Sequence, residues 1–401
     1  MNKKLSMAVA GAVMAFGASA ANAGITIPAG DWTIDIGGNV NSYYTHTRYD
    51  GALDTAAGPG SEDSQSISTG LLPAALGIGG KTRQNDLDIA FQFTFFTGTD
   101  STGGGGTANV YGGNGADSNS LNIRQAYMTF GDKSWGTIKM GRDLGIFGSD
   151  AILSDMTLLG VGTGGGGAGN STLGRIGSGY LYADWVGQIS YTSPNWNGFS
   201  FAVGARQPWG QSDNESLGFD GKVSYEWAGD YAGKVWAGFI RQDNVDQSFL
   251  LPVAVAGEED AHAWEIGGKV NLAGFGLVGY YYDGKGMGSS LVASGNLPTS
   301  GLGVNNSDAD VDGGYVQVTY ALPGIGTKLG ASWGISKVDD NGAAGTDEFE
   351  NESWIIGAYH PLTKSLNLVA EYTDTDYENI SNVDGLNGGA KTIALGAILF
   401  F

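Results

Sequence analysis

Apolar and polar residues alternate in segments of about ten residues along most of the chain. A clear example lies at 365–373, where one face carries Leu366, Leu368, Ala370 and Tyr372. The intervening positions carry Asn367, Val369, Glu371 and Thr373. A period of two is typical of β-strands whose two faces meet different surroundings. Because soluble sandwiches and membrane barrels both alternate in this way, the pattern alone predicts an all-β fold and no more.

The connections between these segments decide between the two architectures. Strands are expected to begin near Thr33, Ile67, Asp86, Leu121, Trp135, Gly179, Gly198, Leu217, Tyr231, Asp260, Gly274, Asp312, Gly324, Glu352, Ser365 and Ala390. Short turns rich in Gly, Pro, Asn and Asp alternate with long loops that are acidic or glycine-rich. Short turns on one side and long loops on the other are typical of outer-membrane barrels. The sequence therefore predicts a transmembrane antiparallel β-barrel of about sixteen strands.

One proline conflicts with this assignment. Pro73 interrupts the second predicted strand, 67–82, where a ladder hydrogen bond is expected. We interpret it as a bulge or as a late start of that strand.

The third long connection stands out by its length. It follows the strand 135–143 and covers about 143–178, with a short apolar segment and a glycine run. Loops of this length without secondary structure are uncommon in compact folds and are usually functional. We expect this loop to fold into the lumen of the barrel and to narrow it.

The first 23 residues have the features of a cleaved secretory signal peptide. Lys3 and Lys4 precede an apolar stretch at 5–16, and Ala21-Asn22-Ala23 matches a cleavage site. The barrel domain is then 24–401, and removal of the two lysines takes the net charge of -21 to -23. A membrane anchor is the alternative, but the apolar stretch is too short to span a bilayer.

The end of the chain carries a second targeting feature. Ile393, Leu395, Ala397, Leu399 and Phe401 occupy every other position up to the terminus. This pattern is typical of a lipid-facing strand that ends in an aromatic girdle. A buried core strand that happens to be last is the alternative.

Composition excludes several other classes of protein. The chain has 70 glycines in 401 residues but no collagen repeat, and it has no cysteine for a disulfide or thiolate site. No stretch of eighteen apolar residues predicts a transmembrane helix. The acidic balance argues against nucleic acid as a partner, and no nucleophile or nucleotide motif indicates an enzyme.

With these features the chain resembles the general bacterial porins, which are trimeric sixteen-stranded outer-membrane barrels. The resemblance rests on T-I-D-I-G-G-N-V-N-S-Y-Y, L-N-I-R-Q-A-Y-M-T-F-G, G-T-I-K-M-G-R-D-L-G and the terminal Phe401. It implies that the loop after Arg142 forms an eyelet in which acidic and basic residues face each other. It also implies that the barrel-assembly machinery recognises Phe401, Leu399 and Leu395. Three copies are then expected to associate through the early strands, with the loop 98–120 in contact with the neighbouring subunit of the trimer.

One departure from the family pattern concerns the basic wall of the eyelet. General porins often carry basic residues on their first two strands, where this chain has Asn39 and Ala75. Because few basic residues are then expected on this wall of the eyelet, the sequence does not support a preference for anions.

The candidate residues of the constriction are charged residues in or beside the third long loop. They are Asp143, Asp150, Asp155, Arg124, Arg142, Arg175 and Lys139. Rings of charge at close quarters govern permeation through a narrow pore. For each aspartate the alternative is a loop residue that caps its own backbone.

Arg142 needs a local irregularity to reach the lumen. Simple alternation places it on the same face as Ile138 and Met140, which is expected to face outward. An outward arginine near the bilayer midplane costs roughly 2–4 kcal/mol. We therefore expect a bulge at Gly141 that turns Arg142 inward.

These residues predict an outer-membrane channel for passive diffusion of small hydrophilic solutes and ions, with cations preferred because the chain is acidic. A porin tuned to short amides, sugars or acidic compounds is the first alternative, and a plugged adhesion barrel is a remote one. No cofactor is expected. Weak bridging by divalent cations between acidic loops and lipopolysaccharide is the only expected metal contact, with outer-membrane lipid as the surrounding partner.

Overall fold

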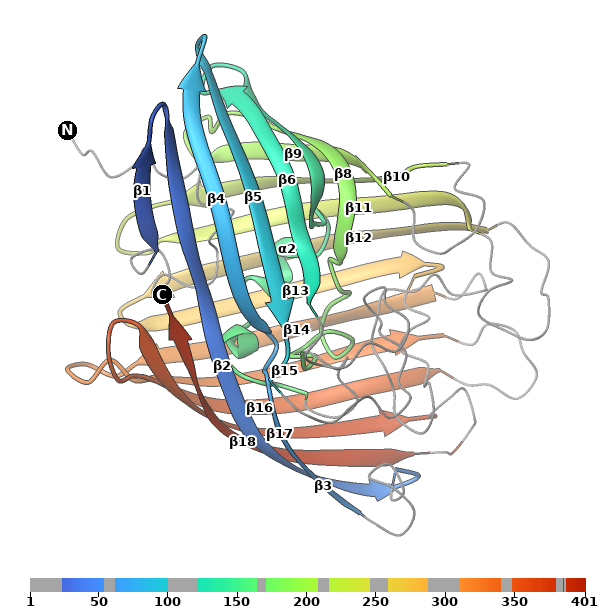
Figure 1. Ribbon diagram of the computed structural model, residues 1–401. Coiled ribbons are helices and arrows are strands. Elements are labelled where there is room, and N and C mark those ends of the chain that lie inside the picture. Colours follow the sequence, from blue (N-terminus) through green and yellow to red (C-terminus); the bar gives the residue numbers. More distant parts are fainter. Residues whose placement is uncertain are drawn as a thin grey trace.

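The computed structural model describes residues 24–53, 62–99, 121–163, 171–207, 216–245, 259–287, 310–339, 348–379, 385 and 387–401. Figure 1 shows an open-ended ring of strands with a loop and a short helix inside it. The strands are β1 (Ile25–Ala29), β2 (Trp32–Gly51), β3 (Asp63–Ser68), β4 (Ala74–Gln84), β5 (Leu87–Thr97), β6 (Asn122–Asp132), β7 (Gly136–Leu144), β8 (Trp185–Thr192), β9 (Phe199–Arg206), β10 (Gly218–Trp227), β11 (Gly233–Val245), β12 (Glu259–Leu272), β13 (Phe275–Lys285), β14 (Asp310–Ala321), β15 (Lys328–Val338), β16 (Phe349–Pro361), β17 (Leu366–Glu378) and β18 (Gly388–Phe400).

The ring closes into a barrel because the last long strand pairs with the first. In the antiparallel ladder of β18 and β2, Phe400 lies opposite Asn39. β3 and β4 pair with different parts of β2, one after the other, so together they take the place of a single strand in the wall. The short β1 pairs only with the beginning of β2. The remaining strands pair with their sequence neighbours, so the wall has sixteen strand positions. The predicted sixteen-stranded antiparallel barrel is confirmed.

The second wall position is interrupted where the proline predicted a break. β3 ends at Ser68 and β4 begins at Ala74, directly after Pro73. Proline has no backbone N–H for a ladder bond, so the strand resumes only after it. The gap leaves the segment 69–73 free to contact the interior of the barrel.

Two of the short turns show why their residues suit them. Asn85 and Asp86 have φ of 48° and 63°, and Ala273 and Gly274 have φ of 49° and 86°. Two successive residues with positive φ form the turn whose twist matches that of a β-hairpin. They lie at the starts of the strands expected near Asp86 and Gly274, where the sequence predicts a short connection to the preceding strand.

The faces of the wall are reversed relative to a soluble barrel. On β18, Ile393 and Leu395 point outward with 46% and 53% exposure, whereas Thr392, on the opposite face, is 3% exposed. The inward faces of β15 and β17 likewise carry buried Ser332, Ser336 and Thr373. An apolar outside and a polar inside are typical of a barrel in a bilayer.

Exposed and half-buried aromatic residues gather toward both ends of the wall. The pairs beside short turns are Trp196–Phe199 and Phe275–Tyr320, and pairs farther from them are Trp264–Tyr281 and Trp333–Trp354. Aromatic girdles of this kind flank the apolar band of membrane barrels.

The residues 145–184 leave the wall after β7 and return to it at β8, and we call them the inner loop. Their described part contains α2 (Ser149–Ile152) and the 3₁₀ turn η2 (Met156–Leu159). A strand was expected to begin near Gly179, but β8 begins at Trp185, so the inner loop is longer than expected. Tyr180, Leu181 and Tyr182 are buried in succession and do not alternate between two faces.

Among the described residues no helix is long and apolar enough to cross a membrane.

Candidate pore constriction

The first arm of the inner loop is held by carboxylates on the wall. Asp220 on β10 accepts a hydrogen bond from the backbone N–H of Ile146 at 2.8 Å. Glu265 on β12 accepts one from the N–H of Gly148 at 3.0 Å and another from the hydroxyl of Tyr280 at 2.8 Å. These acceptors satisfy amide groups that no strand partner serves.

Farther along the loop, β14 supplies the anchors. Gln317 accepts from the N–H of Met156 at 2.7 Å and donates to the carbonyl of Ser154 at 3.0 Å. The hydroxyl of Tyr315 donates to the carbonyl of Ala151 at 2.8 Å. β14 thus fixes the junction between α2 and η2.

A third carboxylate holds the loop where it reaches the opposite side of the barrel. Glu371 on β17 accepts from the N–H groups of Val161 and Gly162 at 2.7 and 2.8 Å, and from the hydroxyl of Tyr359 at 2.7 Å. Gly160 lies so close to it that a Cβ there would stand 2.0 Å from Oε1. Any larger residue there would push the Glu371 carboxylate away from the N–H groups that it accepts from.

Arg175 fixes the return arm. Its guanidinium is fully buried and donates to Ser332, to Ser353 and to the carbonyl of Ser178. Burial lowers the pKa of Arg175 to about 10, and the nearby carboxylate of Asp155 opposes that shift. Arg175 therefore lies in an anchor between loop and wall, away from the open lumen.

Asp155 also has a structural place. It caps η2 by accepting from the N–H of Thr157 at 2.9 Å, and it accepts from the hydroxyl of Tyr180 at 2.8 Å. With 4% exposure it is enclosed by the loop. This is the capping alternative that the sequence left open.

Asp150 joins the loop to two lysines of the wall. Its carboxylate pairs with the ammonium groups of Lys222 on β10 and Lys234 on β11. Lys222 also donates to Ser149 at 2.8 Å. Burial opposes ionisation of Asp150, but the two ammonium groups hold its pKa below the ordinary value.

Asp143 and Lys139 form a second pair on the inward face of β7. The ammonium of Lys139 contacts Oδ2 of Asp143, and the amide of Gln125 on β6 donates to Oδ1 at 2.8 Å. Lys139 also lies over the ring of Tyr127, 5.0 Å from its centroid. Both members of the pair face the lumen.

The two arginines near the long-loop ends of β6 and β7 differ in position. A register shift between Thr94 and Phe95 accompanies the buried Arg124, whose guanidinium lies 5.1 Å from the centroid of the Phe96 ring. Arg142 is paired with Ala126 and Gly187 in ladders that run through Gly141 without a shift.

The unbroken register contradicts the bulge expected at Gly141. Strand alternation places Arg142 on the face of Met140 and Ile189, but its side chain is half-buried and acts on the buried carboxylate of Asp184 at the end of the inner loop. Gly141 has a φ of 126° but adds no residue to the strand, so the bulge that would turn Arg142 inward is missing.

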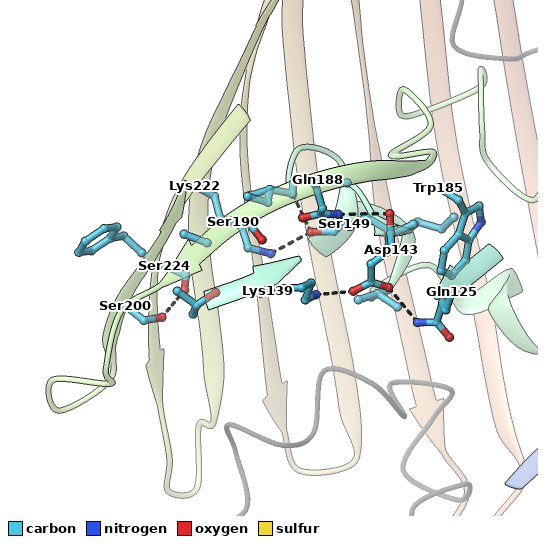
Figure 2. A pocket seen from close by; sticks show the side chains of 18 of the residues that line it. Gln125, Lys139, Asp143, Ser149, Trp185, Gln188, Ser190, Ser200, Lys222 and Ser224 are labelled. Atoms are coloured by element: carbon cyan, nitrogen blue, oxygen red, sulfur yellow. Dashed lines mark hydrogen bonds and ion pairs between the residues drawn. The ribbon is translucent and has the colours of Figure 1, made fainter. Parts of the chain in front are cut away.

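A cavity of about 270 Å³ remains between the inner loop and the wall, and we call it the slot. Figure 2 shows its polar side, where Lys139, Gln125, Gln188, Ser190 and Lys222 converge from β6, β7, β8 and β10. Its loop side carries Ile146, Ile152, Leu153 and Leu158 together with the hydroxyl of Ser149. The wall also contributes apolar groups, from Trp185, Phe201 and Ala202.

The slot differs from the expected eyelet in where its charges lie. The lysines on the wall, Lys222 and Lys234, escaped the sequence analysis, although charged residues at inward positions of alternating strands were the available signal. The positions of Asn39 and Ala75 are buried and uncharged, so the basic residues come from later strands. Within the described ranges, no group of three His, Cys, Asp or Glu residues forms a candidate metal site.

Comparison with known proteins identifies relatives of this fold. A family model described as Gram-negative porin matches residues 8–380. None of the curated proteins matches the chain.

Three solved structures illustrate the similarity. The outer-membrane channel DcaP of Acinetobacter baumannii is 16% identical with a TM-score of 0.64, covering 94% of this chain and 100% of its own. Salmonella typhi OmpF, in a complex with daunomycin, is 18% identical with a TM-score of 0.61, covering 94% and 100%. Vibrio cholerae OmpT in a trimer form is 16% identical with a TM-score of 0.55, covering 92% and 99%.

Proposed function

The chain belongs to the Gram-negative porin family, and we propose that small hydrophilic solutes and ions diffuse passively through its slot. The family assignment makes the protein an outer-membrane channel for small solutes and not an enzyme. The observation that supports the slot as the passage is the distribution of polar groups. The inner loop contacts the walls of β10 to β17, whereas lysines, amides and hydroxyls line the gap that it leaves beside β6 to β11.

We also propose a moderate cation preference for simple salts. The charges at the slot are paired, with Lys139 on Asp143 and with Lys222 and Lys234 on Asp150. The sequence carries 41 acidic against 20 basic residues. Cations are then enriched at the mouths, and screening over about 8 Å at physiological salt keeps the effect moderate.

The assembly that fits these features is a homotrimer, in keeping with the trimer form of Vibrio cholerae OmpT. The outward face of the early strands is a suitable contact. Strand alternation places Arg142 there, between the small residues Ala126 and Gly187, and a charged residue at that face disfavours contact with lipid. The measurement is the mass of the detergent-solubilised protein by light scattering, which we expect to be three chains.

The remaining partners follow from the outer surface of the barrel. Leu395, Leu399 and Phe401 are exposed on the outside of the last strand, where the assembly machinery can read them. The N–H of Phe401 donates to Gly38 at 3.1 Å and completes barrel closure. Lipopolysaccharide and outer-membrane lipid surround the apolar face, and divalent cations bridge acidic loops to lipid phosphates.

Liposome swelling tests the diffusion proposal. Liposomes that contain the purified protein are placed in isotonic solutions of uncharged sugars of increasing size. We expect fast swelling with small sugars and a steep decline with size, because a narrow slot excludes by width. Swelling rates equal to those of protein-free liposomes for every sugar would contradict the proposal.

A further inference from the structure

The slot runs along the full length of β8. Its lining includes both Trp185, the first residue of this strand, and Thr192, the last. Trp185 follows the inner loop and lies at the long-loop end of the wall, whereas Thr192 precedes the short connection to β9. Figure 2 shows Trp185 at one edge of the side chains that line the slot, and its side chain is the largest among them. A solute in the slot therefore passes Trp185 at one mouth, which we call the long-loop mouth.

The indole of Trp185 packs against a residue from a distant strand. Its ring centroid lies 5.6 Å from that of Phe96 on β5, and Phe96 is only 1% exposed. In the wall, β6 and β7 lie between β5 and β8. Three strand spacings amount to about 14 Å, so the two rings meet across the inner side of β6 and β7. We call this pair of rings the aromatic lip.

Contacts on both sides hold the aromatic lip in place. The guanidinium of Arg124 on β6 lies 5.1 Å from the centroid of the Phe96 ring, within the range of an attractive cation–π contact. The carboxylate of Asp184 accepts from the backbone N–H of Trp185 at 2.6 Å, and its carbonyl accepts from the N–H of Gly145 at 2.8 Å. The second of these bonds ties the two ends of the inner loop together directly beside Trp185.

The Trp185 side chain is enclosed on one side and meets the slot on the other. It packs against the apolar cluster of the interior but stays half-buried, and the slot lies beside it. Tryptophan has only two side-chain torsions, so its ring gives a large and rigid surface. A ring that is fixed in this way is suited to set the width of the mouth.

From these contacts we propose that the aromatic lip sets the largest solute that enters the slot, with Trp185 as the residue that determines this size limit. Pore diameter and the charges that line a pore select solutes separately. Asp150 with Lys222 and Lys234 supplies charge from the side of β10 and β11. The lip supplies a limit on width at the long-loop mouth. This inference rests on the proposed diffusion through the slot and names the residue that limits it.

The test compares size limits for uncharged sugars. Liposomes that contain the purified full chain are placed in isotonic solutions of mono-, di- and trisaccharides. We expect Trp185→Ala to move the steep decline in swelling rate to the next larger sugar of the series, because the indole no longer narrows the mouth. Trp185→Phe keeps a ring and should lie closer to the wild type. An unchanged size limit in Trp185→Ala would overturn the proposal.

Trp354→Ala is the matched control. Trp354 lies on the outer face of β16, where it is 56% exposed and packs against Trp333. The variant removes the same ring from the exterior of the barrel, so its size limit should equal that of the wild type. A shift as large as that of Trp185→Ala would show that loss of either tryptophan loosens the barrel, and the lip would be refuted.

A second readout distinguishes a wider mouth from a displaced loop. Amide hydrogen exchange reports on the N–H groups of Met156 and Val161, which Gln317 and Glu371 hold against the wall. We expect Trp185→Ala to leave exchange at both amides unchanged while the size limit rises. Faster exchange at both amides would mean that the inner loop has moved, and the larger limit would no longer support the lip.

The outcomes also separate this inference from the proposed function. Wild-type swelling with the same size limit in Trp185→Ala overturns the lip alone. Absence of swelling with every sugar from the folded wild-type protein overturns the diffusion proposal and the lip with it.

Discussion

The charged residues of the inner loop differ in the groups that they bind. Asp155 and Arg175 are enclosed between loop and wall and satisfy backbone and hydroxyl groups there. Asp150 stands at the border of the slot, where it neutralises lysines that face the passage. The chemical type of a residue was readable from the sequence, but its depth in the loop depends on long-range packing.

At the residue scale, the first prediction concerns Asp150. Asp150→Asn removes the carboxylate shared by Lys222 and Lys234 and makes the slot more positive. We expect the zero-current potential under a potassium chloride gradient to shift toward that of an anion-preferring pore. Asp86→Asn, in an exposed turn, is the control for the same change of charge. A shift no larger than that of the control would argue against charge at the slot as a determinant of selectivity.

The second residue-scale prediction concerns Arg175. Arg175→Met keeps a long side chain but loses the bonds to Ser332, Ser353 and the Ser178 carbonyl. Hydrogen bonds to a charged group contribute about 1.5–3 kcal/mol each, and the serines are left buried without their donor. We expect a lower melting temperature by circular dichroism in detergent.

Arg241→Met is the matched control for that melting experiment. Arg241 lies on the outer face of β11 and pairs with Asp243 and Asp260 in an exposed setting. Exposed ion pairs add little to stability. If both variants melt at the wild-type temperature, Arg175 is not an anchor.

At the scale of elements, the inner loop is docked by carboxylates from three separate strands. Asp220, Glu265 and Glu371 each accept backbone N–H groups of the loop from an inward position of the wall. Backbone donors in a loop need such partners when water is excluded. Docking at several points around the barrel fixes the width of the slot.

Amide hydrogen exchange tests this docking. Glu371→Gln replaces a carboxylate that accepts from Val161, Gly162 and Tyr359 by a weaker acceptor. We expect exchange at the amides of Val161 and Gly162 to accelerate about tenfold, the factor for losing about 1.4 kcal/mol. The amide of Gly148, held by Glu265, is the internal control and should not change. Acceleration spread equally over all three amides would indicate global loosening instead.

The sequence was informative about strands and less so about the loop. Alternation and turn chemistry predicted the sixteen wall positions and the break at Pro73, because a strand and its turn are local structures. The strand expected near Gly179 begins at Trp185 because the tyrosines at 180 and 182 are both buried in loop packing. The bulge expected at Gly141 is absent because a single glycine with positive φ does not require one. Lys222 and Lys234 become neighbours only when β10 and β11 pair and α2 docks against them.

At the scale of the whole molecule, the barrel combines an apolar exterior with a narrowed polar interior. Closure between β18 and β2 removes the free edges that an open sheet would expose. The inner loop fills one side of the lumen, and the slot remains on the other. Passage of solutes and selection among them therefore depend on the same gap.

The most direct test of this account is conductance of the purified full chain in a planar bilayer, with unequal salt on the two sides. We predict discrete current steps, grouped in threes for a trimer, and a zero-current potential of cationic sign. Steps with an anionic potential would contradict the cation preference but leave the open slot in place. Silence from correctly folded protein would contradict the central claim, because the inner loop would then plug the barrel.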